Sequence, residues 1–597
     1  MRDPLEKTQA GDDTPKRIAS AAPHSALKGT AASLVTLATV LGFVLVAYWP
    51  ALSARALYMD DKFYLGSHVI RHPSWSSVET IFTEVLTPSA VSGYYHPFSL
   101  LSLMLNFLEP AASSSLLPFH RTAVILHLLN VALVAVLLRL LFKNWPTACF
   151  TALLYGLHPL NADSVLWIAE RKTVLSTCFA LGSLVGYVSY AQHATRAGHG
   201  NWKRYGACLI LYAGALLSKP TTLPVVAIFL VLDYWPLNRL NRQTLWEKVP
   251  FLVLCGVSAA VAIISQARTA NDGFVQFMPL SHVPLVIGYC IGLYLSKVVW
   301  PAGLVSDYYL PPTFANAEVF GAVAGAVIVV AAAVLSTRWT RAWLAGSLFF
   351  VVAIVPTLGI FRYTSSVAAN RSMYLPMVGL LLPINWEMNR LLSAVSGTLN
   401  AYRLRALLAG LGATLVVGST VILRDYESHW SDTLTLLRYY LSQAPHDWKL
   451  HTRMGDEWIR LGEYPSAIDE FRAAVHSDPT VTETHLNLGR GLFTAGEYAQ
   501  AKEALAEALV TGPGDWRGHL LMGMTLDRQK DLEGALAEFQ TASRLAPSRG
   551  LPHYHIANVL KRQGKRDEAT QEYRESLRLE PQFTDARKAL DSLNLGR

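Results

Sequence analysis

The stretch GDEWIRLGEYPSAIDEFRAAVHSDP, residues 455–479, decides the fold of the C-terminal part of this 597-residue chain. It ends at a proline, and prolines recur at a strict step of 34 residues, at Pro445, Pro479, Pro513, Pro547 and Pro581. Because proline cannot continue a helix, each of these positions predicts the end of a helical unit. A 34-residue period indicates an array of stacked helical hairpins.

Small and large residues also recur in register within each unit. The small residues are Ala467, Ala501, Ala535 and Ala569, and the large residues four positions later are Phe471, Leu505, Phe539 and Tyr573. The close-contact position in the first helix of each unit is held by Gly455, Gly489, Gly523 and Ala557. Together with the period, this pattern predicts four tetratricopeptide (TPR) repeats over 446–597, an α-solenoid that follows a linker at 425–445.

A ladder of histidines follows the same 34-residue step. Its members are His451, His485, His519 and His553. They are either a row of metal ligands or packing positions. Neighbouring repeats stack about 10 Å apart, as packed helices do, whereas ligands lie about 2 Å from a shared metal. We therefore predict packing positions.

The rest of the chain has the composition of a membrane protein. Hydrophobic residues make up 52% of the sequence and charged residues only 16%, whereas charged residues are about a quarter of soluble domains. Apolar runs long enough to cross a hydrocarbon core of about 30 Å occur up to residue 424 and then stop. The sequence predicts an all-α protein with a disordered cytoplasmic N-terminus at 1–29 and a polytopic membrane bundle at 30–424, followed by the linker and the repeats.

The apolar runs predict about eleven transmembrane spans. They lie at 31–50, 119–141, 146–160, 173–192, 204–218, 221–236, 249–267, 317–337, 342–361, 373–392 and 404–424. A twelfth run at 282–300 is ambiguous. If it does not cross and the N-terminus is inside, every inside loop is basic, as the positive-inside rule requires. We therefore predict a re-entrant or interfacial helix at 282–300, with a crossing as the alternative.

This orientation places the loop 51–118 and the repeats on the outside face, where ionisable residues gather. The candidate site residues among them are Asp60, Asp61, His96, His158, Glu170, Arg171, Lys172, Lys219 and Arg371. A charged group at the centre of a membrane helix costs about 2.5–3.5 kcal/mol, so such a cluster usually lines a cavity. Taken alone, the pair Asp60 and Asp61 can be a solvated loop, and Lys219 can reach to the membrane interface.

Several segments of the membrane region carry a resemblance. They are YMDDKFYL (58–65), HPFS (96–99), HPLNADSVLWIAERKTVLS (158–176), LLSKP (216–220), LDYWPL (232–237) and NRSMYLP (370–376). In this order, ahead of TPR repeats, they resemble the transmembrane and tetratricopeptide-repeat (TMTC) O-mannosyltransferases and their bacterial relatives, members of the GT-C glycosyltransferase superfamily. The resemblance covers nearly the whole chain and implies a GT-C-like fold for 30–424.

The resemblance implies a glycosyltransferase that moves a sugar, mannose in the family, from a polyprenyl phosphate to an acceptor, commonly a protein Ser or Thr hydroxyl, on the non-cytoplasmic face. It implies that one of Asp60 and Asp61 is the general base, and we favour Asp60. A hydroxyl needs such a base, and a departing phosphate needs cations nearby. The predicted donor or substrate residues are His96, His158, Glu170, Arg171, Lys172, Lys219, Arg371 and Tyr374. Direct displacement would invert the anomeric centre.

Two other classes of function stay open. One is a non-catalytic membrane scaffold that presents the repeats to protein partners. The other is a transporter, which should show an internal duplication of its spans that this sequence lacks. We predict no metal, no cofactor and no nucleic-acid partner; the predicted partners are the lipid-linked sugar, an acceptor protein on the repeats and the bilayer. The predicted location is a bacterial inner membrane with periplasmic repeats, or the endoplasmic-reticulum membrane in a eukaryote.

Overall fold

The computed structural model describes residues 23–85, 95–197, 200–269, 281–309, 316–358, 366–394 and 399–595. These residues are helical and contain no β-strand, only an isolated bridge between Tyr308 and Ala368. The chain divides into two compact units. The first comprises residues 1–52, 60–301 and 306–425, and the second comprises 53–59, 302–305 and 426–597.

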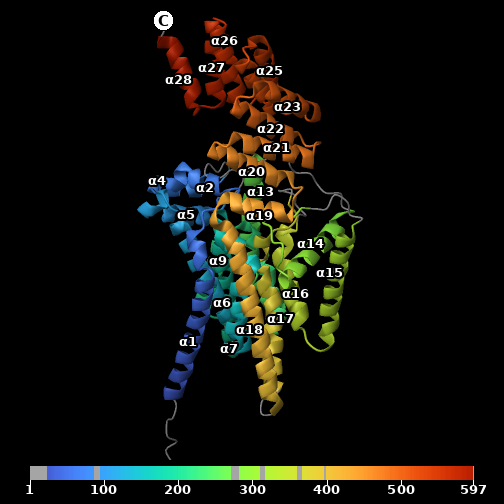
Figure 1. Cartoon of the computed structure of the whole chain (residues 1–597). Helices are drawn as coiled ribbons and strands as arrows, with labels where there is room; N and C mark the ends of the chain where they lie inside the picture. The colour runs from blue at the N-terminus through green and yellow to red at the C-terminus, as the bar shows by residue number, and fades with distance from the viewer. Residues whose placement is uncertain are drawn as a thin grey trace, which may run out of the picture. The chain divides into compact units, whose positions relative to one another are not determined.

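The first unit is a helical bundle (Figure 1). Its helices up to residue 200 are α1 (Pro23–Ala47), α2 (Asp61–Gly66), α3 (His68–Arg71), α4 (Trp75–Thr83), α5 (Pro97–Asn106), α6 (Leu117–Phe142), α7 (Trp145–Leu157), α8 (Ala162–Leu166) and α9 (Arg171–Ala197). The later ones are α10 (Trp202–Ser218), α11 (Val225–Tyr234), α12 (Arg242–Trp246), α13 (Val249–Thr269), α14 (Val283–Val299), α15 (Ala317–Leu335), α16 (Ala342–Ile354), α17 (Pro376–Ala394) and α18 (Leu399–Ser428).

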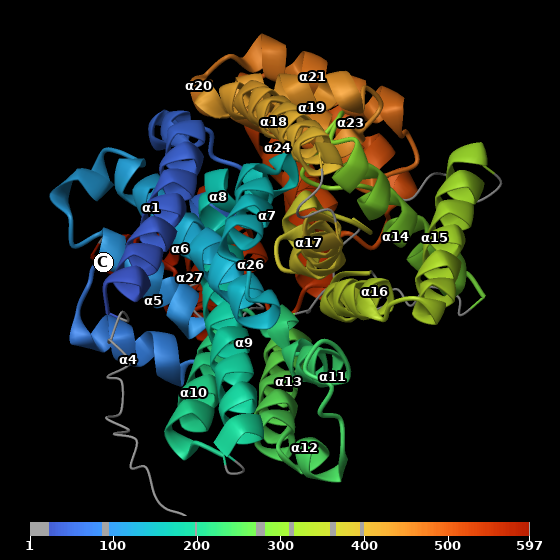
Figure 2. The ribbon, with the colours of Figure 1, turned by 90° about the horizontal axis from the view of Figure 1, so that it is seen from below.

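Helix α9 lies at the centre of this bundle. It packs against α6 and α10, while α16 packs against α17 and α14 against α15 (Figure 2). The most apolar window of α9 is 61% buried, whereas that of α18 is only 11% buried. Because the exposed faces of α18 are apolar, hydrocarbon rather than water is their natural surroundings.

Each predicted apolar run coincides with a helix, but the count of about eleven spans is not confirmed. Five helices of the described residues are long and apolar enough to cross a membrane: Leu117–Phe142, Ile168–Ala197, Arg242–Ser265, Val319–Arg338 and Arg405–Ser431. Other apolar helices, such as Ala31–Ala47 and Val283–Val299, are shorter. At 1.5 Å per residue, a helix needs about 20 residues to cross the hydrocarbon core.

Two segments predicted to lack regular structure contain helix. Residues 1–22 lie outside the described residues, but 23–29, which we expected to be disordered, are the first turns of α1. The predicted linker at 425–445 contains helix α19 (Thr433–Gln443), whose Asp432 side chain accepts a hydrogen bond from Thr435 N and caps it. Leu436 and Tyr440 of α19 are buried, so an amphipathic face holds this segment in place.

The loop predicted at 51–118 is also more structured than expected, because α2 to α5 lie in it. Helix α5 begins at Pro97, which is tolerated in the first turn of a helix, and buries Leu100 and Leu103. It packs against α10, α3 and α4. The segment that carries the predicted acidic pair is therefore anchored on the bundle.

The second unit contains the repeats, and the predicted TPR solenoid is confirmed. Its helices are α20 (Trp448–Leu461), α21 (Tyr464–Ser477), α22 (Thr482–Ala495), α23 (Tyr498–Thr511), α24 (Trp516–Arg528), α25 (Leu532–Leu545), α26 (Gly550–Arg562), α27 (Arg566–Leu579) and α28 (Thr584–Leu595). A Cβ added at Gly455 would lie 2.5 Å from the Phe471 ring. The first helix of the repeat therefore needs glycine to approach the second this closely.

The histidine ladder consists of packing positions, as predicted. His451 Nδ1 lies 2.7 Å from Glu470 Oε2, and the same pair recurs at His519 with Glu538 and at His553 with Glu572. In the second repeat Ala504 replaces the acid, and His485 keeps the bond from Nε2 to Pro479 O, which His451 and His519 also make to Pro445 O and Pro513 O. Each histidine is thus bonded close by in sequence rather than to the next histidine of the ladder.

Candidate active site

Two segments far apart in sequence meet at the predicted acidic pair. Asp61 is the first residue of α2, and its buried carboxylate accepts a hydrogen bond of 2.7 Å from Ala169 N. Ala169 belongs to the 3-10 turn Ile168–Glu170 that leads into α9. This bond fixes the start of α2 beside the N-terminal end of α9, and so places Asp60 next to Lys172.

Six ionised side chains form a cluster at this junction, which we call the charged cluster. Its acids are Asp60, Glu170 and Asp307, and its bases are Lys172, Lys219 and Arg371. They come from five separate stretches of the first unit. The formal charges balance, which is the condition under which such groups tolerate burial.

Glu170 is the hub of the charged cluster. Its side chain is 2% exposed, and its carboxylate lies 3.1 Å from Lys219 Nζ, 3.6 Å from Lys172 Nζ and 3.4 Å from Arg371 Nε. Thr173 also donates a hydrogen bond to this carboxylate. Three cations therefore converge on one buried anion, and the carboxylates of Asp60 and Asp307 lie against two of them.

Asp60 is the accessible acid of the charged cluster. Its side chain is 39% exposed, and Oδ2 lies 3.7 Å from Lys172 Nζ. Asp61, by contrast, is fully buried and bonded to backbone. Of the two predicted carboxylates, only Asp60 combines access from solvent with a cation beside it.

The electrostatics of Lys219 follow from its burial. Burial lowers the pKa of this ammonium to about 8; attraction by Glu170 partly opposes the effect, and repulsion by Lys172 and Arg371 adds to it. Its Nζ also donates a hydrogen bond of 2.7 Å to Thr173 Oγ1. Lys219 is thus a cation whose charge is sensitive to pH near neutrality.

Aromatic and polar neighbours hold the charged cluster in place. Lys172 lies over the ring of Tyr64, 5.6 Å from its centroid, and the Tyr64 hydroxyl is 3.0 Å from His96 Nε2. Arg371 stacks over Trp167 at 4.9 Å and donates to Asp307 Oδ1 at 2.9 Å. Tyr64 therefore connects His96 to the cluster.

Three predicted site residues lie apart from the charged cluster. Arg171 is buried and donates to Ser102 Oγ, Asn106 Oδ1 and Phe119 O, so its guanidinium ties α5 and α6 to α9. His158 caps the end of α7 and lies 3.1 Å from Val298 O. Tyr374 is buried against His127 and Asn130 of α6. The structure therefore places these three side chains in the interior of the bundle, where each has hydrogen-bond partners, and their predicted role in donor binding stays a prediction.

Asp307 is a member of the charged cluster that the sequence interpretation missed. It lies in an irregular segment between α14 and α15, and it meets Arg371 only in the folded chain. The signal available was an acid directly before Tyr308 and Tyr309 in a predicted outside loop. Among the described residues, no group of three or more His, Cys, Asp or Glu side chains is arranged to hold a metal ion.

Known proteins resemble this chain along most of its length. Protein O-mannosyl-transferase Tmtc1 of Drosophila melanogaster is 21% identical over 554 residues, which cover 75% of this chain and 62% of that protein. Human TMTC1 is 23% identical over 443 residues, covering 64% and 48%. The chain is similar to the TMTC O-mannosyl-transferases. It spans between about half and two thirds of the length of these two relatives.

The repeats match known repeat proteins by themselves. Residues 486–549 and 552–583 match two models of the tetratricopeptide repeat family. Among solved structures, the TPR protein TTC0263 of Thermus thermophilus is 20% identical, covers 32% of this chain and 96% of its own, and has a TM-score of 0.25. YrrB, titled a TPR protein with an unusual peptide-binding site, is 17% identical, covers 30% and 90%, and has a TM-score of 0.24.

Proposed function

We propose that this chain is a glycosyltransferase of the GT-C type, which moves a sugar from a polyprenyl-phosphate donor to a protein Ser or Thr hydroxyl on the non-cytoplasmic face. The names of its relatives favour mannose as the sugar. The observation that carries the proposal is the exposed Asp60 carboxylate 3.7 Å from Lys172, beside a hub where three cations meet.

Asp60 is the general base in this proposal. The acceptor hydroxyl attacks the anomeric carbon of the sugar, the new carbon–oxygen bond forms, and the hydroxyl proton passes to the Asp60 carboxylate. The bond from the anomeric carbon to the phosphate breaks on the opposite side, so the configuration at that carbon inverts. Asp61 supports the base by holding the start of α2 on Ala169 N.

The cations of the charged cluster stabilise the leaving polyprenyl phosphate. As the bond to the sugar breaks, negative charge builds up on the phosphate oxygens in a place largely removed from water, where cations act strongly. Lys172 and Arg371 are 13% and 17% exposed, so each can approach a donor at the surface of the cluster. Glu170 keeps them in place when no donor is bound.

The membrane orientation follows from the basic loops. With the N-terminus inside, the charged cluster and the repeats share the outer face, and the array can present acceptor proteins as TPR surfaces do. About eleven crossings and a re-entrant α14 belong to this proposal. Its location is then a bacterial inner membrane with periplasmic repeats, or an endoplasmic-reticulum membrane.

A non-catalytic scaffold is the rival function, because the TPR array alone is a sufficient partner-binding module. In a scaffold the charged cluster would only tie helices together. Neutralising the half-exposed Asp60 would then leave every glycan unchanged.

The test compares purified full-length protein with its Asp60→Asn variant in lipid nanodiscs, with polyprenyl-phosphate mannose or glucose and Ser/Thr peptides. We expect kcat to fall by about 10²–10⁴-fold, the usual contribution of a general base, with donor affinity within about 3-fold of wild type because the phosphate-binding cations remain. Glu109→Gln is the matched control, since Glu109 is a similarly exposed acid that pairs with Arg121 away from the cluster. Wild-type turnover in Asp60→Asn would exclude Asp60 as the base, and no turnover by wild type with any donor would favour the scaffold.

A further inference from the structure

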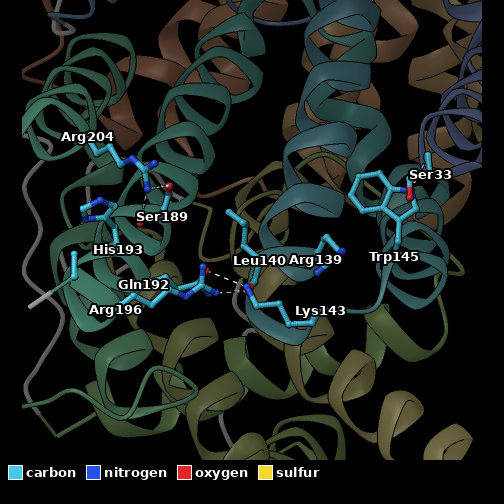
Figure 3. A pocket seen from close by; sticks show the side chains of 11 residues that line it. Ser33, Arg139, Leu140, Lys143, Trp145, Ser189, Gln192, His193, Arg196 and Arg204 are labelled. Carbon is cyan, nitrogen blue, oxygen red and sulfur yellow. Dashed lines mark hydrogen bonds between the residues drawn. The ribbon is translucent and has the colours of Figure 1, made fainter. Parts of the chain in front are cut away.

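A second polar site lies in the first unit, where α6 and α9 end and α10 begins. It is a cavity of about 1010 Å³, shown in Figure 3. Its basic and aromatic lining residues are Arg139, Lys143, Trp145, His193, Arg196 and Arg204. None of them belongs to the charged cluster, so this site is separate from the proposed reaction.

Positive charge without an acid distinguishes this cavity. Three arginines and a lysine line it, and no Asp or Glu is among its described lining residues. Lys143 Nζ donates to the neutral Gln192 Oε1 at 3.0 Å, and Arg204 donates to Ser189 O and Oγ (Figure 3). For Arg139 and Arg196, no ion pair or hydrogen bond to the side chain is found within the part of the chain that the structure describes.

The cations that line this cavity also repel one another. The pKa of Lys143 is lowered by burial and then by the charges of Arg196 and Arg139. Arg204 lies in the first turn of α10, where the helix dipole disfavours a cation. A bound anion would remove both penalties, and a phosphate accepts bidentate hydrogen bonds from arginine.

Exposed apolar side chains lie next to the cavity. Ser33 lines it, and the next residues of α1, Leu34 and Val35, are 61% and 65% exposed. Trp145 donates from Nε1 to Ser33 O, which is the behaviour of an interfacial tryptophan. An acyl chain attached to a phosphate in the cavity would run along the exposed side chains of α1.

We propose that this cavity binds the phosphate headgroup of an anionic phospholipid of the membrane. Basic pockets between transmembrane helices on the cytoplasmic side recognise such headgroups, and the basic loops place these residues on that side. The negative charge of the lipid phosphate offsets part of the repulsion among the four cations and holds together the ends of three helices. Binding of this lipid does not depend on the transferase activity.

The test is native mass spectrometry of delipidated full-length protein titrated with phosphatidylglycerol, diphosphatidylglycerol or phosphatidylcholine. We expect the two anionic lipids to bind wild type, and Arg139→Gln with Arg196→Gln to weaken that binding roughly 10- to 30-fold, since each basic side chain near an anionic lipid contributes about a factor of 5. The matched control is Arg242→Gln with Arg338→Gln, two exposed arginines on the same predicted face outside the cavity. It should bind like wild type.

Three outcomes would overturn the proposal: equal binding of phosphatidylcholine, equal losses in the two double variants, or displacement of the lipid by millimolar inorganic phosphate. The last would mean that the site takes free phosphate and not a lipid. If the double variant is not monodisperse, Arg196→Gln alone serves, because this side chain is exposed. A single variant that binds like wild type would also count against the proposal.

Discussion

Glu170 shows what a single buried carboxylate can organise. An ionised group transferred from water to a protein interior costs several kcal/mol, and attraction repays this only where partners and hydrogen bonds are well placed. Here two ammonium groups, one guanidinium and the Thr173 hydroxyl surround it. Removing the hub would leave three cations facing one another, so we regard it as a positioning residue for Lys172, Lys219 and Arg371.

Lys219 makes the proposed donor site sensitive to pH. Its pKa of about 8, lowered chiefly by burial, means that the ammonium is charged below that pH and neutral above it. Only the charged ammonium of Lys219 attracts phosphate. Donor affinity should therefore fall about 10-fold as pH rises through 8, because one hydrogen bond to a charged group contributes about that much. Measuring donor Kd across this range checks the expectation.

The control for this pH effect is Lys219→Arg. A guanidinium stays charged at all these pH values, so the variant should bind the donor with no loss near pH 8. A pH profile that is the same in wild type and Lys219→Arg would show that another group is responsible.

Charged residues in apolar surroundings could be identified from the sequence, but their directions could not. Glu170 ends the 3-10 turn before α9, and Arg171 and Lys172 begin the helix, yet Glu170 and Lys172 face the cluster while Arg171 donates to Phe119 O. Successive helical residues are about 100° apart, and composition does not say which face is inward. Asp307 was missed because its partner Arg371 lies far along the chain.

At the scale of the element, close helix contacts in the repeats depend on glycine. A Cβ at Gly523 would lie 2.6 Å from the Phe539 ring, whereas one at Gly514 meets nothing within 4 Å. We expect Gly523→Ala to destabilise its repeat by about 1 kcal/mol, because overpacking of about 1–3 kcal/mol exceeds the helical preference of alanine. Hydrogen exchange of α24 and α25 amides in the full-length protein measures this.

Gly514→Ala is the matched control and should leave that exchange unchanged. Ala557 holds the equivalent place in the last repeat beside Tyr573, so the position accepts a methyl group where its partner has adjusted. Equal protection in both variants would contradict the close-contact role of Gly523.

The His451–Glu470 pair gives the first repeat a pH dependence. The pKa of His451 is raised above 6.5, first by its hydrogen bond to Glu470. A raised histidine pKa stabilises the fold below the unfolded value, and the effect is lost as pH rises through the folded value. Glu470→Gln should therefore cost up to about 1 kcal/mol at acidic pH and little at alkaline pH.

Hydrogen exchange of the α20 and α21 amides, measured once at acidic and once at alkaline pH, checks this difference in stability. His485→Gln is the comparison, since Ala504 replaces the acid in its repeat and no such pH difference is expected. A loss in Glu470→Gln that does not change with pH would refute the charge-based account.

Helices were predictable from the sequence because apolar runs and the proline period are local signals. The segments that form α19 and α5 lack such a signal, and the sequence interpretation did not identify them as helices. α19 was taken as linker because its amphipathic stretch is short and lies outside the 34-residue step. α5 was taken as loop because ten apolar residues do not suggest a span. Both helices depend on packing against residues far away in the sequence.

At the scale of the whole molecule, the proposed orientation predicts which residues meet the outside. In a variant with all five cysteines replaced by alanine, an impermeant maleimide added to spheroplasts should label Ser548→Cys in the repeats but not Lys203→Cys. Both positions are exposed, so reactivity reports sidedness and not burial. Labelling of Lys203→Cys without Ser548→Cys would reverse the orientation, and the proposed base would then lie on the wrong face.

The wide spacing of the charged cluster in sequence has a consequence for biogenesis. The repeats are built from neighbours, so each hairpin of the tail can form soon after it emerges from the ribosome. The ions around Glu170 come from residues between Asp60 and Arg371. A nascent chain that ends before Arg371 contains Lys172 and Lys219 but lacks the Arg371 guanidinium. The charged cluster is therefore completed only late in membrane insertion.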